Sequence, residues 1–293
     1  MRKSLTAPDV RSRKGEGSPL VMVTAYDAPT ARVADAAGVD MILVGDSVAM
    51  VVLGYDDTLQ VGVDDIAHHT GAVVRGLAGE RGTERATPQP LVVADLPWMS
   101  YHVSREDTVR NAAALVRAGA AAVKLEGGAK RLPAVAAIVD AEIPVMGHLG
   151  LTPQSVHALG GYKVQGKAFD AAQALIDDAV ALAEAGCFSI VLECVPDEVA
   201  RAVTAAVDVP TIGIGAGPHC DGQVLVFHDL TGLEDRIQPK FVRRYASLKG
   251  DATAAVAAFA ADVREGRFPT AEESYGVSRE LGETLGLYGA QTA

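Results

Sequence analysis

The stretch Met41-Ile42-Leu43-Val44-Gly45-Asp46-Ser47 decides the fold, because four apolar residues run directly into a glycine, a carboxylate and a hydroxyl. A short apolar run bounded by glycine is typical of a strand buried on both faces, so we expect Asp46 where the strand leaves the core. Three further apolar runs end in an acid, at Asp95, Glu126 and Glu193. The sequence therefore predicts parallel strands that deliver carboxylates to one rim.

A repeated unit supports this interpretation. Ala-Gly pairs at residues 37–38, 118–119 and 185–186 each stand seven or eight residues before such an acid, as expected for a helix, a glycine cap, a strand and an acid. About eight strands alternating with helices indicate a parallel sheet, either closed into a barrel or open and doubly wound. Closure is favoured, because an open sheet would gather its site at one switch point. We expect an α/β fold, a single (β/α)8 TIM barrel.

Composition excludes several classes of partner. The chain has 293 residues and a formal net charge of -11, which argues against nucleic acid or an anionic membrane, since both need a cationic surface. No apolar run approaches the roughly 18 residues of a membrane span. Cys187, Cys194 and Cys220 follow no pairing pattern, which favours reduced thiols. A soluble, cytoplasmic protein is expected.

Three parts are expected along the chain. Residues 1–19 should form a flexible N-terminal arm, residues 20–268 the catalytic barrel, and residues 269–293 a loosely ordered C-terminal tail. Within the barrel, the glycine-rich residues 149–168 form an unusually long connection, which we expect to act as a lid or to contact substrate. Residues 79–90 are expected to form a surface loop at the opposite end.

Asp46, Asp95 and Glu126 are hard oxygen donors with no histidine or cysteine at metal-binding spacing, which favours Mg²⁺ over Zn²⁺. The alternative for each acid is a helix cap, but a cluster of uncompensated carboxylates would repel one another. Lys124 shares a strand face with Glu126. We expect it to bind a substrate carboxylate, or else to form an ion pair with Glu126 or Asp95.

Glu193 is followed by Cys194-Val195-Pro196, and a largely apolar setting suits a general base. His148 could polarise a substrate oxygen or be a hydrogen-bonded structural histidine. The segment Gly213-Ile214-Gly215-Ala216-Gly217 lacks the third glycine of the dinucleotide fingerprint and precedes Pro218. Close backbone packing at a strand end is therefore the favoured interpretation there.

Over about residues 20–275 the chain resembles the ketopantoate hydroxymethyltransferase family. The resemblance rests on an ordered set of motifs, which includes Val44-Gly45-Asp46-Ser47, Val123-Lys124-Leu125-Glu126-Gly127-Gly128, Gly147-His148-Leu149-Gly150-Leu151-Thr152-Pro153-Gln154-Ser155 and Leu192-Glu193-Cys194-Val195-Pro196.

The resemblance implies a barrel of the phosphoenolpyruvate/pyruvate-domain type. It also implies transfer of a hydroxymethyl group from 5,10-methylenetetrahydrofolate to 3-methyl-2-oxobutanoate, giving 2-dehydropantoate in pantothenate and coenzyme A synthesis. By resemblance, Mg²⁺ binds Asp46, Asp95 and Glu126, and Glu193 is the general base. The oxo acid contacts the side chains of Asp46, Ser47, Asp95 and Lys124. A homodecamer, built as a pentamer of dimers, is implied as well.

Two features depart from the family pattern. The stretch Glu272-Glu273-Ser274-Tyr275 lacks a histidine, and residues 79–90 form a longer loop than usual. Two alternatives remain: a Mg²⁺-dependent lyase or mutase of the phosphoenolpyruvate/isocitrate lyase type, and a barrel that binds oxo acids without turnover. The motifs around Glu193 and Gly160-Gly161-Tyr162 argue against the first. Burying so many carboxylates without a function argues against the second.

Overall fold

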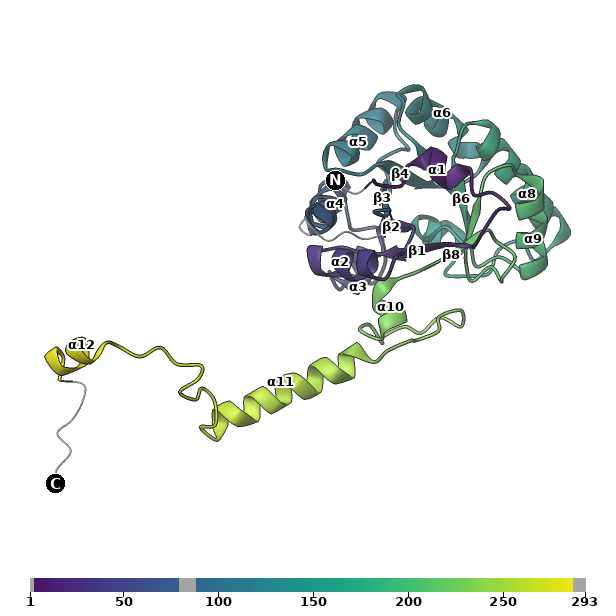
Figure 1. The fold of residues 1–293 in the computed structure, drawn as a ribbon. Coiled ribbons are helices and arrows are strands. Elements are labelled where there is room, and N and C mark those ends of the chain that lie inside the picture. The colour runs from purple at the N-terminus through teal and green to yellow at the C-terminus, as the bar shows by residue number, and fades with distance from the viewer. Residues whose placement is uncertain (1–2, 79–87, 287–293) are drawn as a thin grey trace. The chain divides into compact units, whose positions relative to one another are not determined.

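The fold was taken from a computed structural model, which describes residues 3–78 and 88–286. Within these residues, eight parallel strands pair in sequence order, and β1 also pairs with β8, so the sheet closes into a barrel (Figure 1). The predicted (β/α)8 closure is therefore confirmed. The strands are β1 Leu20–Thr24, β2 Met41–Val44, β3 Leu91–Asp95, β4 Ala122–Glu126, β5 Val145–Gly150, β6 Ser189–Glu193, β7 Thr211–Ile214 and β8 Gly222–Leu225.

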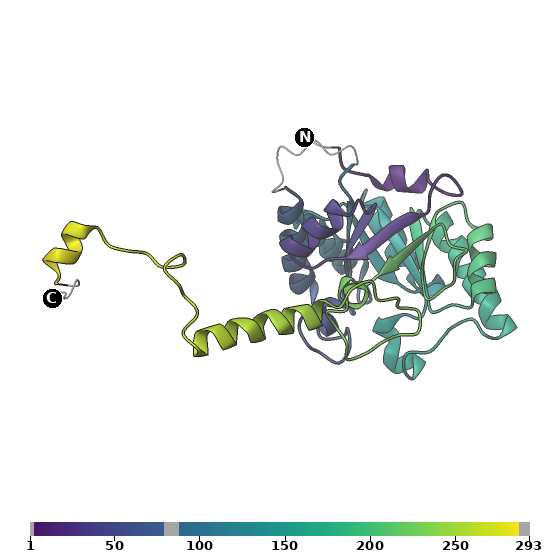
Figure 2. The same cartoon turned by 60° about the horizontal axis from the view of Figure 1, so that its bottom comes forward.

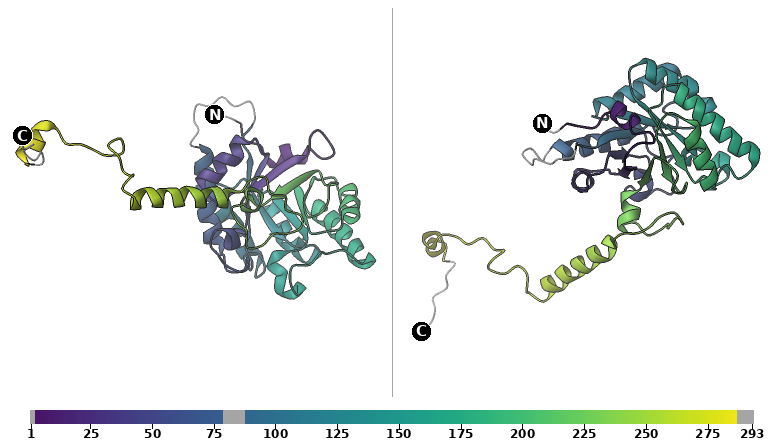
Figure 3. Two further views of the ribbon diagram at one scale, coloured as in Figure 1. Left: turned by 90° about the horizontal axis from the view of Figure 1, so that it is seen from below. Right: turned by 45° about the vertical axis from the view of Figure 1, so that its right-hand side comes forward.

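Helices surround the strands, as the two further views in Figure 3 show from below and from the side. The longer helices that follow β1 to β6 are α2 Ala28–Ala36, α4 Val63–Ala78, α5 Arg105–Arg117, α6 Leu132–Asp140, α8 Phe169–Glu184 and α9 Asp197–Ala206. Shorter helices are α1 Ala7–Arg11, α3 Val48–Val51, η1 Ala129–Arg131, η2 Pro153–Ser155, α7 Val156–Leu159 and α10 Phe227–Thr231. The connection from β7 to β8 is short and contains no helix.

Local chemistry explains where these helices begin and end. At the start of α5, Ser104 Oγ accepts a hydrogen bond from the backbone N–H of Asp107 at 3.1 Å, which satisfies an amide that the helix leaves free. Gly119, just after α5, has a φ of 111°, and Gly186, just after α8, has a φ of 100°. A side chain would be strained at these angles, so glycine lets the chain turn into the next strand.

Two apolar cores stabilise the barrel. One lies between the strands and the surrounding helices and includes Ile42, Val92 and Leu125. The other fills the barrel interior and includes Met22, Met41 and other inward side chains. The alternation of side chains along each strand divides the residues between the two cores, and both faces of β2, β3 and β4 are buried, whereas β1 and β8 leave Val21 and Gln223 exposed.

The N-terminal segment differs from the flexible arm that the sequence suggested. Helix α1 begins with a capping box at Thr6 and buries Ala7 and Val10 among the side chains of the barrel interior. It lies across one end of the barrel, where Figure 2 shows it at the top of the view. Lys14 Nζ donates a hydrogen bond to Asp221 Oδ2 at 2.8 Å, which ties the segment to β8. The apolar residues of α1 keep water from the barrel interior at this end.

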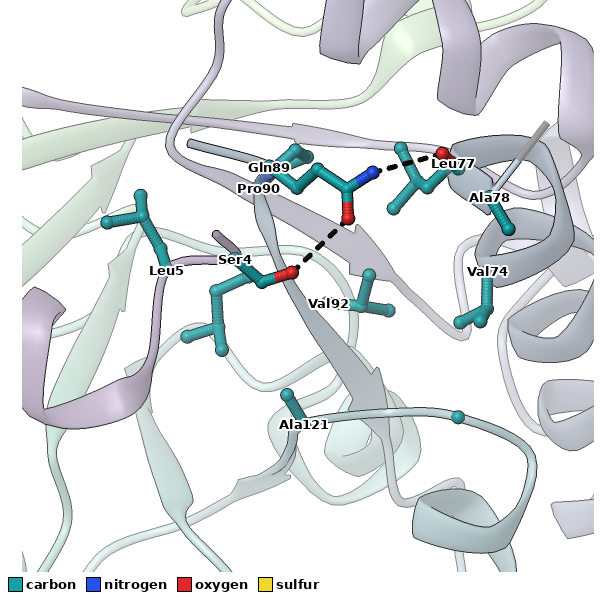
Figure 4. A pocket seen from close by; sticks show the side chains of 11 residues that line it. Ser4, Leu5, Val74, Leu77, Ala78, Gln89, Pro90, Val92 and Ala121 are labelled. Atoms are coloured by element: carbon teal, nitrogen blue, oxygen red, sulfur yellow. Dashed lines mark hydrogen bonds between the residues drawn. The ribbon is translucent and has the colours of Figure 1, made fainter. Parts of the chain in front are cut away.

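A small cavity of about 200 Å³ lies beside this segment, between it, α4 and the start of β3 (Figure 4). Gln89 spans it: its Oε1 accepts from Ser4 Oγ at 3.2 Å and its Nε2 donates to the Leu77 carbonyl at 3.1 Å. No titratable side chain occurs among the described residues that line this cavity. Part of the expected loop at residues 79–90, namely 79–87, lies outside the described residues.

Contacts divide the chain into two compact units, and the boundary falls between Tyr245 and Ala246 rather than near residue 268. The second unit contains α11 Leu248–Arg264 and α12 Arg279–Thr284. No residue of α11 is buried. Along residues 3–78 and 88–286, no helix is both long and apolar enough to cross a membrane.

Candidate active site

The acids predicted at strand ends meet at one end of the barrel. Strands β3, β4 and β6 end on Asp95, Glu126 and Glu193, and Asp46 stands two residues beyond the end of β2. One cavity of about 480 Å³ is lined by every residue that the sequence singled out, namely Asp46, Ser47, Asp95, Lys124, Glu126, His148 and Glu193. Parallel strands all point their carboxyl ends the same way, so closure of the barrel gathers side chains that are far apart in sequence.

The register between neighbouring strands decides which of these side chains touch. Asp95 of β3 pairs with Lys124 of β4, and Lys124 Nζ lies 3.0 Å from Asp95 Oδ1. Glu126 pairs with His148 of β5, whose Nδ1 lies 3.5 Å from Glu126 Oε1 and 3.3 Å from Lys124 Nζ. The ion pair with Asp95, which the sequence left open as one explanation for Lys124, is thus present.

Glu193 lies beside a polar partner, although the sequence suggested largely apolar neighbours. His148 Nε2 lies 3.2 Å from Glu193 Oε2. The end of β5 comes unusually close to Glu193: a Cβ on Gly150, whose φ is 91°, would stand 2.2 Å from the Glu193 carbonyl oxygen. Only glycine fits there, and it allows Leu151 N–H to donate to that oxygen at 2.8 Å. The backbone carbonyl of Glu193 is therefore held by the segment that follows β5.

Two polar residues that the sequence left without a role stand among the acids. Gln154, which is 5% exposed, donates to Asp46 Oδ2, and Tyr101, which is 3% exposed, hydrogen-bonds to Gln154 and to the backbone of Glu126. Gln154 lies within the motif that ends at Ser155 and within the long glycine-rich connection, and these two features of the sequence could have indicated that it belongs to the site. Nothing in the sequence around Tyr101 indicated its position.

Loops complete the cavity. The long connection after β5 lines it through Leu151, Pro153, Tyr162, Lys163 and Val164. The segment after β8 contributes Arg236, Lys240 and Phe241, and the Arg236 guanidinium donates to the carbonyl of Met50 next to the site. Ser47 Oγ shares a 2.8 Å hydrogen bond with the buried Tyr26 hydroxyl. The result is a charged floor under walls that are largely apolar.

The segment from Gly213 to Gly217 packs against side chains, whereas the sequence suggested close contacts with backbone. A Cβ on Gly215, whose φ is 64°, would stand 2.7 Å from the Phe241 ring, and one on Gly217 would stand 2.5 Å from Asp197 Oδ1. These glycines make room for side chains. Strand β8 follows at Gly222, with no helix between it and Gly217, so no phosphate-binding helix opens here.

Burial and mutual repulsion shape the electrostatics of the floor. Burial, together with the nearby charges of Asp95 and Glu126, raises the pKa of Asp46 well above its usual range. Burial also raises the pKa of Asp95, although Lys124 opposes the shift. Burial lowers the pKa of His148, but hydrogen bonds to Glu126 and Glu193 outweigh this effect and raise it to about 9. The positive charges of the neighbouring protein groups are thus too few to keep the pKa values of Asp46 and Asp95 in their usual range.

The chemistry of this floor fits a divalent cation. If all four carboxylates of Asp46, Asp95, Glu126 and Glu193 were ionised, the charges of Lys124 and His148 would still leave an excess of two negative charges, and burial together with this repulsion raises the pKa values of Asp46 and Asp95. The buried Oδ1 atom of Asp95 accepts no well-aligned hydrogen bond. Among the described residues, no three His, Cys, Asp or Glu side chains are grouped as a ready-made metal site; Lys124 Nζ lies 3.0 Å from Asp95 Oδ1, and Gln154 donates to Asp46. Oxygen donors of this kind suit Mg²⁺.

The fold and the site define the class of protein first. Solved structures with this fold include a phosphonopyruvate hydrolase, with a TM-score of 0.59 and 15% identity over 96% of this chain and 95% of that one. A 2,3-dimethylmalate lyase of the PEP mutase/isocitrate lyase superfamily matches with a TM-score of 0.56 and 19% identity, over 97% of this chain and 95% of its own. The chain is a TIM barrel of the type found in that superfamily, with a carboxylate-rich cavity at the carboxyl ends of its strands.

Sequence comparison then gives the family. Residues 4–271 match the profile of ketopantoate hydroxymethyltransferase. A relative from Moorella thermoacetica, named 3-methyl-2-oxobutanoate hydroxymethyltransferase, is 54% identical over 94% of this chain and 98% of its own length. One of the same name from Heliobacterium modesticaldum is 52% identical over 98% of this chain and 100% of its own. The chain belongs to the ketopantoate hydroxymethyltransferase family.

Proposed function

We propose that this protein is a cytoplasmic, Mg²⁺-dependent enzyme that transfers a hydroxymethyl group from 5,10-methylenetetrahydrofolate to 3-methyl-2-oxobutanoate. The products are 2-dehydropantoate, for pantothenate and coenzyme A synthesis, and tetrahydrofolate, and water supplies the new hydroxyl oxygen. The observation that carries the proposal is the meeting of Lys124, Glu193 and three further carboxylates in one cavity of a chain from this family.

Each side chain then has a role that its position supports. Glu193 removes the proton from C3 of the oxo acid, and the ring of His148 holds the Glu193 carboxylate in place at 3.2 Å. Lys124 binds the substrate carboxylate, with Asp46, Ser47 and Asp95 beside it. A Mg²⁺ ion held by Asp46, Asp95 and Glu126 would supply Lewis-acid stabilisation of negative charge on the keto oxygen. The apolar walls exclude water while the proton moves.

The direct test combines the purified protein with 3-methyl-2-oxobutanoate, methylenetetrahydrofolate and Mg²⁺. We expect 2-dehydropantoate to accumulate, as followed by mass spectrometry, and to disappear when a chelator removes the metal. A reaction that gives no product, together with cleavage or rearrangement of phosphonopyruvate or 2,3-dimethylmalate, would instead favour the lyase or mutase alternative.

Lys124→Ala is expected to raise the KM for the oxo acid by about ten- to a hundredfold, because a hydrogen bond to a charged group is worth about 1.5–3 kcal/mol. Lys124→Arg should restore only part of the affinity, since the guanidinium fork does not match the geometry of an ammonium group. Steady-state kinetics with each substrate varied in turn measure both effects. If only the KM for the folate changes, Lys124 does not bind the oxo acid.

We also propose a homo-oligomer, with a decamer built as a pentamer of dimers as its form. The support lies in α11, which presents Val256, Phe259 and Val263 to solvent, with 67%, 54% and 47% of each exposed. Apolar side chains at this spacing on a helix that buries none of its residues favour association.

A further inference from the structure

Gln154 occupies the centre of the acid cluster. Its side-chain Nε2 donates to Asp46 Oδ2 at 2.8 Å and to the Leu96 carbonyl at 3.0 Å, while its backbone N–H donates to Glu126 Oε2 at 3.0 Å. One residue thus forms hydrogen bonds with two carboxylates, one from the turn after β2 and one from the end of β4. These acids would otherwise turn away from each other, because both are buried and negatively charged.

Tyr101 fixes which way the Gln154 amide points. The Tyr101 hydroxyl donates to Gln154 Oε1 at 2.6 Å and accepts from the backbone N–H of Glu126 at 3.2 Å. Because Oε1 faces this donor, Nε2 must face Asp46. The hydroxyl contacts the backbone of Glu126 and the side chain of Gln154 together, so it couples the two acids a second time.

The same arrangement restrains one oxygen of each acid. Gln154 holds Asp46 Oδ2 and Glu126 Oε2, and the backbone N–H of Asp46 donates to Asp95 Oδ2 at 3.0 Å. The opposite oxygens of Asp95 and Glu126 face Lys124 and His148. Each of these carboxylates thus has one restrained oxygen, and the opposite oxygens of Asp95 and Glu126 lie 3.0 Å from Lys124 Nζ and 3.5 Å from His148 Nδ1, on the side of the cluster where positive charge gathers.

We propose that Gln154, oriented by Tyr101, is a positioning residue that holds one oxygen of Asp46 and one of Glu126 and so keeps both carboxylates oriented to bind a divalent cation. The inference rests on the proposed Mg²⁺ site. Partners behind metal ligands usually change metal affinity or activity by about ten- to a hundredfold when they are removed. Gln154 neither binds the cation itself nor touches the reacting atoms.

The test replaces the amide while keeping its size. Gln154→Met retains the volume and the backbone N–H but removes the donor to Asp46, so we expect the Kd for Mg²⁺, measured by calorimetry, to rise by about ten- to a hundredfold. Activity should fall at low Mg²⁺ and largely recover when Mg²⁺ saturates the variant, because the chemical step itself is unaffected. If Gln154 only stabilised the fold, saturating Mg²⁺ would not restore the activity of the variant.

Tyr101→Phe provides a second variant should Gln154→Met fold poorly. It removes only the hydroxyl, so the Gln154 amide loses its orienting donor, and we expect a smaller rise in the Kd, up to about tenfold. The double variant should bind Mg²⁺ no more weakly than Gln154→Met alone, since both changes act along the same chain of hydrogen bonds. Additive losses would contradict the proposed coupling.

Ser189→Ala is the matched control for loss of a buried hydrogen bond. Ser189 Oγ donates to the Pro210 carbonyl at 2.8 Å and lies at the start of β6, at the end opposite the acids. Its loss should lower the Tm and leave the Kd for Mg²⁺ unchanged. If Gln154→Met and Tyr101→Phe both bind Mg²⁺ with the wild-type Kd, the positioning role is wrong, while the proposed metal site still stands. A wild-type protein that binds no Mg²⁺ would overturn the proposed metal site and the inference together.

Discussion

Glu193→Gln is expected to slow exchange of the C3 hydrogen of 3-methyl-2-oxobutanoate for deuterium by about a hundredfold to ten-thousandfold, the usual range for loss of a general base. Exchange needs only the oxo acid, the metal and the base, so it should proceed in heavy water without folate, as followed by proton NMR. Glutamine keeps the size of the side chain and can still hydrogen-bond to His148, whose Nε2 lies 3.2 Å from the Glu193 carboxylate.

The variant should still bind substrate and metal, because neither role is assigned to Glu193. Glu198→Gln is the matched control: it removes the same charge from an exposed position near the start of α9, five residues along the chain, and should exchange at the wild-type rate. Wild-type exchange in Glu193→Gln would assign the base to another residue, with His148 the first to examine. No exchange in the wild type, with product formed once folate is added, would mean that deprotonation waits for folate.

Asp95→Asn is expected to weaken Mg²⁺ binding more than a hundredfold, beyond the range for a partner behind a metal ligand, because it removes a charged donor from the cluster itself. The asparagine oxygen can still accept from the backbone N–H of Asp46, which contacts Asp95 Oδ2 at 3.0 Å. Loss of the buried ion pair with Lys124 should lower the Tm of the metal-free variant, while the retained hydrogen bond and the reduced repulsion among the acids limit that loss, so the drop in Mg²⁺ affinity should be the larger effect. Asp46→Asn should behave in the same way, and calorimetry combined with thermal unfolding measures both quantities.

Asp221→Asn should give the reverse result. Asp221 lies at the opposite end of the barrel, where its carboxylate accepts from Lys14 Nζ and from the backbone N–H of Thr211, both at 2.8 Å. Removing that charge should lower the Tm and leave Mg²⁺ affinity unchanged. If Asp95→Asn instead loses thermal stability while Mg²⁺ affinity is retained, the strand-end acids are structural.

The sequence alone determined the architecture and the residue types of the site. Strands β2, β3, β4 and β6 contain short apolar runs, and α2, α5 and α8 are each followed by a glycine, and such signals act over a few neighbouring residues. The positions of Asp95, Glu126 and Glu193 at the last residues of β3, β4 and β6 could therefore be predicted. Closure also followed, because acids at strand ends spread over the whole chain can meet only if the sheet curls round.

Only the tertiary structure decided which atoms meet. The contacts of Lys124 with Asp95 and of His148 with Glu193 depend on strand register and on barrel curvature, which no local signal sets. Gln154 and Tyr101 reach the acids from loops 53 residues apart, and helix α1 closes an end that forms only after β1 pairs with β8. Backbone preference is local, whereas these contacts require the long-range pairing of segments whose individual conformations leave their partners open.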